Sequence, residues 1–97
     1  MLTHSRQIYN LDELRKFVNN TLCQQEQLEA DSFPMSERLL VRKDQPCGMF
    51  FCLHGPRSVK VTAIWETDRN QLLFYDSTGQ RFLRTQLLTA PTLAAAC

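Results

Sequence analysis

Three apolar-rich runs separated by two short turns fill the segment 58–88. In the first run, apolar residues recur at every second position from Val59 to Trp65, and mostly polar residues lie between them. A period of two is typical of a half-buried antiparallel strand. The second turn contains Gly79, which we expect at positive φ. The segment therefore predicts an antiparallel meander with strands at 58–66, 71–76 and 81–88.

A single amphipathic helix precedes this meander. Asn10 is a favourable N-cap residue, and Glu13 stands three positions later, as in a capping box. The apolar residues that follow recur with helical spacing: Leu11, Leu14, Phe17, Val18, Leu22 and Leu28. Pro34 cannot continue a helix. We expect a helix over 10–30. The lead-in at 1–9 is expected to be either a loose segment or a short edge strand.

Two further strands are predicted between the helix and the meander. The segment 37–43 carries apolar residues on both sides, and a turn at 44–46 follows it. The segment 47–54 is the most apolar run of the chain, which favours a central strand. Together these elements predict one domain over 1–97 of the α+β class, with one N-terminal amphipathic helix packed on an antiparallel meander sheet of about five strands over 37–88 and a tail at 89–97.

The composition is that of an ordinary globular domain. Hydrophobic residues make up 43% of the chain, charged residues 22%, and the formal net charge is +1. No apolar run reaches the ~20 residues that span a bilayer, and the N-terminus lacks the apolar stretch of a secretory signal. We therefore expect no membrane association, a cytoplasmic or nuclear location, and four cysteines present as free thiols.

Cys47, Cys52 and His54 are the candidates for metal binding or thiol chemistry. A zinc site needs four ligands in tetrahedral reach, but residues 47 and 52 point to opposite faces of the predicted strand. Cys52 and His54 share a face and could form a thiolate–imidazole pair, although no orienting third group is evident. Burial of these cysteines as small apolar groups is the favoured interpretation, and no metal or cofactor is expected.

A set of basic and aromatic residues on the predicted strands and loops is the candidate partner-binding surface. The loop at 54–58 supplies hydrogen-bond donors that could hold a phosphate or a carboxylate, although an ordinary solvated connection is the favoured interpretation. Trp65 is either a core residue, which its strand pattern favours, or an exposed anchor for a partner. The candidate residues are His54, Arg57, Lys60, Trp65, Tyr75, Arg81 and Arg84.

These features favour a small non-enzymatic protein-interaction module, either an adaptor or a regulatory subunit. We expect it to bind a protein partner through an exposed sheet face or edge strand, with a homodimer through an edge strand as one form of this. The alternative is RNA binding by basic residues on the sheet, since an antiparallel sheet is a known platform for RNA. Acidic residues interleave with the basic ones, which favours an ordinary solvated face over an RNA-binding one. A thiol enzyme that uses Cys52 and His54 is a third class.

Overall fold

The computed structural model describes residues 2–89 and 91 of the chain. It contains one helix and six strands of one sheet. In chain order the elements are β1 (Leu2–Arg6), α1 (Leu11–Gln25), β2 (Met35–Arg42), β3 (Gln45–His54), the 3₁₀ turn η1 (Pro56–Ser58), β4 (Lys60–Glu66), β5 (Gln71–Tyr75) and β6 (Arg81–Leu87). None of the described helices is long and apolar enough to cross a membrane.

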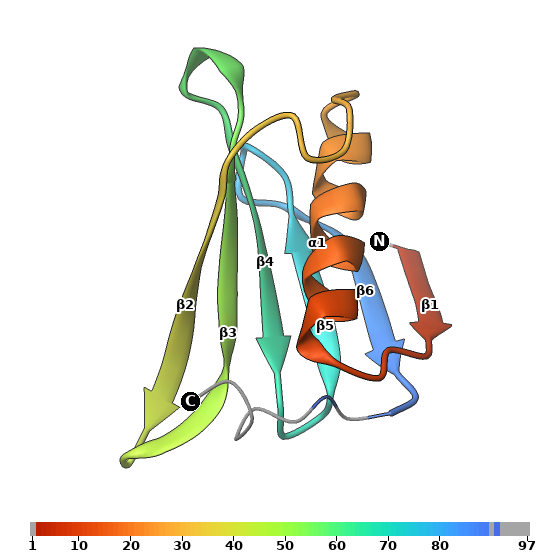
Figure 1. Cartoon of the computed structure of the whole chain (residues 1–97), viewed down its shortest axis with the longest axis vertical. Coiled ribbons are helices and arrows are strands. Elements are labelled where there is room, and N and C mark those ends of the chain that lie inside the picture. The colour runs from red at the N-terminus through yellow and green to blue at the C-terminus, as the bar shows by residue number, and fades with distance from the viewer. Residues whose placement is uncertain (1, 90, 92–97) are drawn as a thin grey trace.

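The sheet has the spatial order β1-β6-β5-β4-β3-β2 (Figure 1). Strands β2 to β6 form an antiparallel meander, and β1 pairs in parallel with β6 at the far edge. The predicted α+β class is confirmed. The strand count is six rather than five, because the N-terminal segment forms an edge strand beside the last strand of the chain.

Helix α1 begins as its sequence predicts. The side chain of Asn10 accepts a hydrogen bond from the Glu13 backbone N–H at 2.9 Å, and the Glu13 carboxylate accepts one from the Tyr9 N–H at 3.0 Å. The first bond is that of a capping box, whereas the second comes from the N–H of the residue before the N-cap rather than from that of Asn10. The helix ends at Gln25, five residues earlier than predicted. Gln27 adopts a left-handed conformation with φ of 58°, and Leu28 N bonds to Cys23 O at 2.8 Å, which closes the helix in a Schellman motif.

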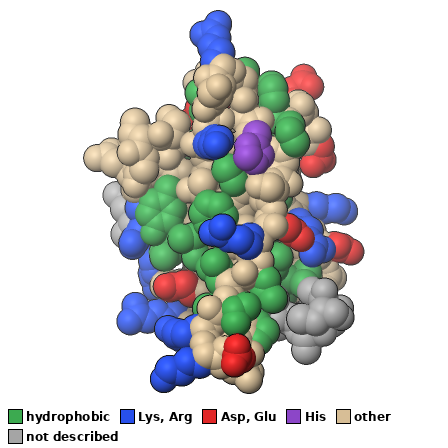
Figure 2. Space-filling view, turned by 90° about the vertical axis from the view of Figure 1, so that its left-hand side faces the viewer, with side chains coloured by type: hydrophobic (Ala, Val, Ile, Leu, Met, Phe, Trp, Pro, Cys, Tyr) green, Lys and Arg blue, Asp and Glu red, His purple; other side chains and the backbone are tan. Residues whose placement is uncertain are grey.

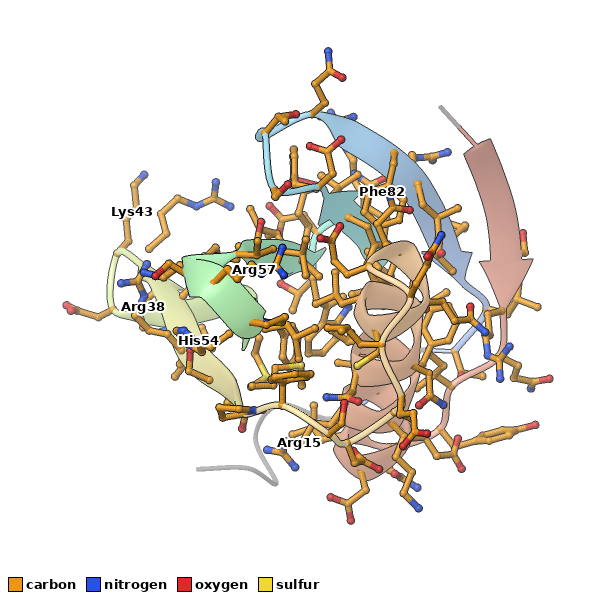
Figure 3. All side chains as sticks on the ribbon, turned by 90° about the horizontal axis from the view of Figure 1, so that it is seen from above. Arg15, Arg38, Lys43, His54, Arg57 and Phe82 are labelled. Carbon is orange, nitrogen blue, oxygen red and sulfur yellow. The ribbon has the colours of Figure 1, made fainter. Side chains whose placement is uncertain are left out.

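The core lies between α1 and the concave side of the sheet. Seen from above, the sheet curls around the helix (Figure 3). Trp65, Phe51 and Phe74 are fully buried on the sheet side, with exposed fractions of 1%, 0% and 0%. The helix contributes Leu14, Val18 and Leu22, each 0% exposed. Burial of such side chains stabilises the fold by about 1.5–3 kcal/mol each, which makes this interface the main source of stability.

The hairpin between β2 and β3 turns one residue earlier than predicted. Its turn residues are Lys43 and Asp44, both left-handed, with φ of 52° and 62°. Pro46 therefore lies inside β3, where it pairs with Val41. The pairing of β3 with β4 begins only at Gly48, so Pro46 has no strand on its other side and its missing N–H leaves no ladder bond unmade.

Candidate functional site

The face of the sheet that points away from α1 is here called the outer face. Its residues alternate with the buried core residues along β2 to β6. Within the apolar part of the outer face, Cys52 and Leu73 are buried, each 7% exposed, and the other residues are half-buried. This apolar part comprises Leu40, Phe50, Cys52, Ile64, Leu73 and Tyr75.

Two arginines lie over aromatic rings of the outer face. The guanidinium carbon of Arg38 is 5.4 Å from the centroid of Phe50, and that of Arg81 is 5.6 Å from the centroid of Tyr75. Each contact is worth about 0.5–1 kcal/mol at an exposed site. The stacking places a positive charge at each side of the apolar part, because β2 and β6 lie on opposite sides of β3, β4 and β5.

A polar network crosses three strands of the same face. Arg84 Nε donates to Gln71 Oε1 at 2.6 Å, and the Gln71 amide donates to the Glu66 carboxylate. The Gln86 amide, in turn, donates to the carbonyl of Arg69 at 2.9 Å. Gln71 is only 5% exposed, so its side chain is fixed by these bonds. Sequence analysis gave no sign of this network, because Gln71 and Arg84 lie on different strands and meet only through the β5–β6 register.

The hydrogen-bond donors predicted in the loop at 54–58 do not form one cluster. The imidazole Nε2 of His54 lies 3.0 Å from the hydroxyl of Ser36, on the neighbouring strand β2. Arg57 and Ser58 are both left-handed, with φ of 59° and 63°, a conformation that costs free energy for residues other than glycine. Arg57 is exposed and lies in η1, between β3 and β4, in the loop at the top of Figure 1.

The candidate residues from sequence divide into three groups. His54, Lys60, Tyr75, Arg81 and Arg84 belong to the outer face or its rim. Arg57 lies in the loop above that face. Trp65 is on the opposite side of the sheet, where it is buried and its indole N–H donates to Asn70 Oδ1 at 3.1 Å. The core interpretation of Trp65 is thus confirmed, and it contributes no contact surface.

The thiols have surroundings that differ from one another. Cys23 and Cys52 are buried and Cys47 is half-buried, and none of the three forms a disulfide. Burial raises the pKa of the Cys23 thiol above its usual value. Over 2–89 and 91, no group of three or more His, Cys, Asp or Glu side chains could hold a metal ion. Cys97 lies outside the described residues.

A cavity of about 230 Å³ lies at the start of α1, and Arg6, Lys16 and Phe17 are among its lining residues. Arg6 stacks over the Phe17 ring, 4.6 Å from its centroid. The volume is below the ~300–1,000 Å³ typical of small-molecule sites. This cavity therefore gives little room for a substrate.

The edge strand β2 is a surface feature that sequence analysis did not single out. Leu39 is 39% exposed and Val41 is 56% exposed, although both are large aliphatic residues. Figure 2 looks onto this edge and shows hydrophobic side chains interspersed with both basic and acidic ones. The only sequence signal was the apolar content of 37–43, which also fits a covered strand.

Comparison of the chain with protein-family models, curated proteins and solved structures finds no match. The outer face and the β2 edge are the surface features of the described residues that bear on function.

Proposed function

We propose that the protein is a small non-enzymatic interaction module of the cytosol or nucleus that binds an acidic surface of a protein partner with its outer face. The observation that carries this proposal is an apolar area with arginines stacked on its rings and further cations around it. The half-buried residues of the apolar part supply area for burial on binding: Leu40, Phe50, Ile64 and Tyr75. The surrounding charges favour an acidic partner and steer its approach.

The balance of charge on the outer face supports an acidic partner. Its basic residues are Arg38, Arg42, Lys60, Arg81 and Arg84, whereas Glu66 is its acidic strand residue. Arg42 already forms an ion pair with Asp68, with 2.7 Å between Nη2 and Oδ2. Arg84 is bound to neutral amide oxygens, so its charge remains available to a partner. The excess of positive charge on this face is therefore large compared with the +1 of the whole chain.

RNA is the alternative partner, because the same cations would attract phosphates. Bases bind open sheets by stacking on exposed aromatic rings. Here Arg38 and Arg81 already lie over the rings of Phe50 and Tyr75. A stacked base would have to displace them from the covered ring faces, which favours a protein partner over RNA.

The test of the proposal is affinity capture from lysate with quantitative mass spectrometry. The variant Lys60→Glu/Arg81→Glu reverses two outer-face charges, and Lys16→Glu/Arg69→Glu makes the same change in net charge elsewhere on the exposed surface. We expect the wild type and the control variant to capture one or more acidic proteins in equal amounts. The outer-face variant should capture about tenfold less of the same proteins. Titration of the purified partner should then show equal affinity for the wild type and the control variant, and weaker affinity for the outer-face variant.

Two results would overturn the proposal. One is an identical set of captured proteins for the wild type and both variants. The other is tight binding of a 20-nucleotide poly(U) RNA that weakens steeply between about 50 and 200 mM salt, together with no salt-resistant protein partner. The second result would support the RNA alternative.

A further inference from the structure

The backbone of β2 leaves a row of hydrogen-bonding groups along one side. Among the strands of residues 2–89, β2 has a neighbour, β3, on one side only. The His54 N–H donates to the Pro34 carbonyl at 2.9 Å, which makes this a hydrogen-bonded pair at the start of the ladder. Hydrogen-bonded and non-hydrogen-bonded pairs alternate along an antiparallel ladder. Met35, Glu37 and Leu39 therefore direct their N–H and C=O groups toward the open side.

The side chains of β2 give this edge two different faces. On the outer side Arg38 is exposed and lies over Phe50. On the helix side Leu39 and Val41 are exposed aliphatic residues, because α1 does not extend over them. Glu37, on the same side, is held by Arg15 of the helix. A strand added here would meet a cation on one face and aliphatic side chains on the other.

A second copy of β2 fits this edge poorly. If two copies paired antiparallel with their helices on the same side, a register centred on Arg38 or on Leu40 would place arginine opposite arginine. The register centred on Leu39 would place Arg38 and Arg42 diagonal to each other across the pair. Like charges directly opposite each other are destabilising, which disfavours the registers centred on Arg38 and on Leu40. The charges of the edge thus favour a strand of different sequence.

We propose that the free edge of β2 accepts an extended segment of a partner protein as a seventh strand. In this segment, acidic residues face Arg38 on the outer side and aliphatic residues face Leu39 and Val41 on the helix side. This inference deepens the proposed protein-binding function and rests on it. The backbone bonds supply affinity and the alternating side chains supply selectivity, as in strand addition generally.

The probe is a fluorescein-labelled heptapeptide of alternating acidic residues and valines, and its control carries lysines in place of the acids. The main protein variant is Leu39→Pro, which removes a donor from the open side and none from the β2–β3 ladder. Leu39→Thr is its matched control, since it shortens the aliphatic side chain but keeps the N–H. Binding is measured by fluorescence polarisation, and amide exchange of Glu37 and Leu39 is followed by NMR.

We expect the wild type to bind the acidic peptide and to discriminate against the lysine peptide. Leu39→Pro should weaken binding about tenfold, whereas Leu39→Thr should stay within about threefold. Amide exchange at Glu37 and Leu39 should slow at saturation, and Arg38→Glu should reverse the preference between the two peptides. If Leu39→Pro does not fold, a peptide N-methylated on the amides that face β2 tests the same bonds from the other side, with the same expected loss.

The edge proposal fails if the acidic peptide does not bind at about 1 mM, if both peptides bind equally, or if Leu39→Pro and the N-methylated peptide bind undiminished. The outer-face capture experiment uses neither Leu39 nor Arg38. A partner that is lost with Lys60→Glu/Arg81→Glu but retained by Leu39→Pro leaves the proposed function intact and overturns the edge proposal alone.

Discussion

Arg15 of the helix and Glu37 of the edge strand β2 form an ion pair across the helix side of the sheet. Arg15 Nε donates to both carboxylate oxygens of Glu37, at 3.0 and 2.8 Å. The hydrogen bond that Arg15 donates to Glu37 is the largest cause of the raised pKa of Arg15. The pair is a direct polar connection between the helix and an edge strand that has only one neighbouring strand.

The Arg15–Glu37 pair is expected to contribute little free energy. The two side chains are 37% and 33% exposed, so solvent screens their attraction. A double-mutant cycle with Arg15→Ala and Glu37→Ala, measured by urea unfolding, should give a coupling energy of about 0.5 kcal/mol. Arg69→Ala, on an exposed loop, is the control for loss of a cation. A coupling energy above about 2 kcal/mol would contradict this.

Gly48→Ala is expected to be strongly destabilising. A Cβ at Gly48 would lie 2.1 Å from the backbone carbonyl oxygen of Trp65, so two central strands would have to move apart. We expect a loss of about 3 kcal/mol in the free energy of unfolding. Gly55→Ala is the matched control, because its new Cβ meets only ordinary contacts at 3.5 Å or more. Equal stability of the two variants would show that the β3–β4 spacing is wrong.

Asp76 is expected to make stability depend on acid pH. The Thr78 hydroxyl is the largest cause of its lowered pKa, and the backbone N–H groups of Thr78, Gly79 and Gln80 add to it. Because the folded-state pKa is lowered, the contribution is full above the unfolded-state pKa and is lost as pH falls through the folded-state value. The difference in melting temperature between the wild type and Asp76→Ala should therefore shrink as the pH is lowered from neutral. A difference that is constant with pH rules the carboxylate out as its cause.

Asn70→Ala is expected to weaken the closure of the β4–β5 hairpin. Asn70 accepts the indole N–H of Trp65 at 3.1 Å and donates to the carbonyl of Thr89 at 2.9 Å, from a left-handed backbone with φ of 49°. Alanine leaves the buried indole N–H without its partner, at a cost of about 1–3 kcal/mol. The fluorescence of Trp65, the one tryptophan of the chain, reports both its environment and the unfolding transition. Asn70→Asp keeps an acceptor, so it should recover part of the loss.

The thiols should react with an alkylating reagent in the order of their exposure. In a Cys97→Ser background, half-buried Cys47 is expected to react first, and buried Cys52 and Cys23 to react slowly. The raised pKa of Cys23 slows it further, since the thiolate is the nucleophile. Rates are read by mass spectrometry at neutral pH. Fast and selective alkylation of Cys52 would instead support the thiol-enzyme class.

Local sequence patterns predicted the parts of the fold that depend on local chemistry. The N-cap bond from the Glu13 N–H to the Asn10 side chain is present, because it needs only three residues of spacing and a helical backbone. The apolar stripe predicts a helix that extends to Ala30, because it includes Leu28. In the structure the helix ends at Gln25, and Leu28 packs against the core from outside it. The Schellman motif that ends the helix has Gln27 at its left-handed position, where glycine would be the usual signal.

The candidate site was predicted only in part. The basic residues of the strands were recognised, but their number alone did not show that Arg38 and Arg81 lie over rings. Such contacts depend on which strand lies beside which. The register shift between Phe74 and Tyr75, which pairs Tyr75 with Arg81, has no signature in the sequence.

The sequence by itself determined the two sides of the sheet and the stripe of the helix, because a period of two or 3.6 residues fixes which side of each element is apolar. Only the tertiary structure decided that β1 joins the sheet in parallel beside β6 and that β2 is left at the opposite edge. Strand order depends on pairing between residues far apart in the chain, which no local period records. The exposed row from Glu37 to Val41 is a consequence of that order.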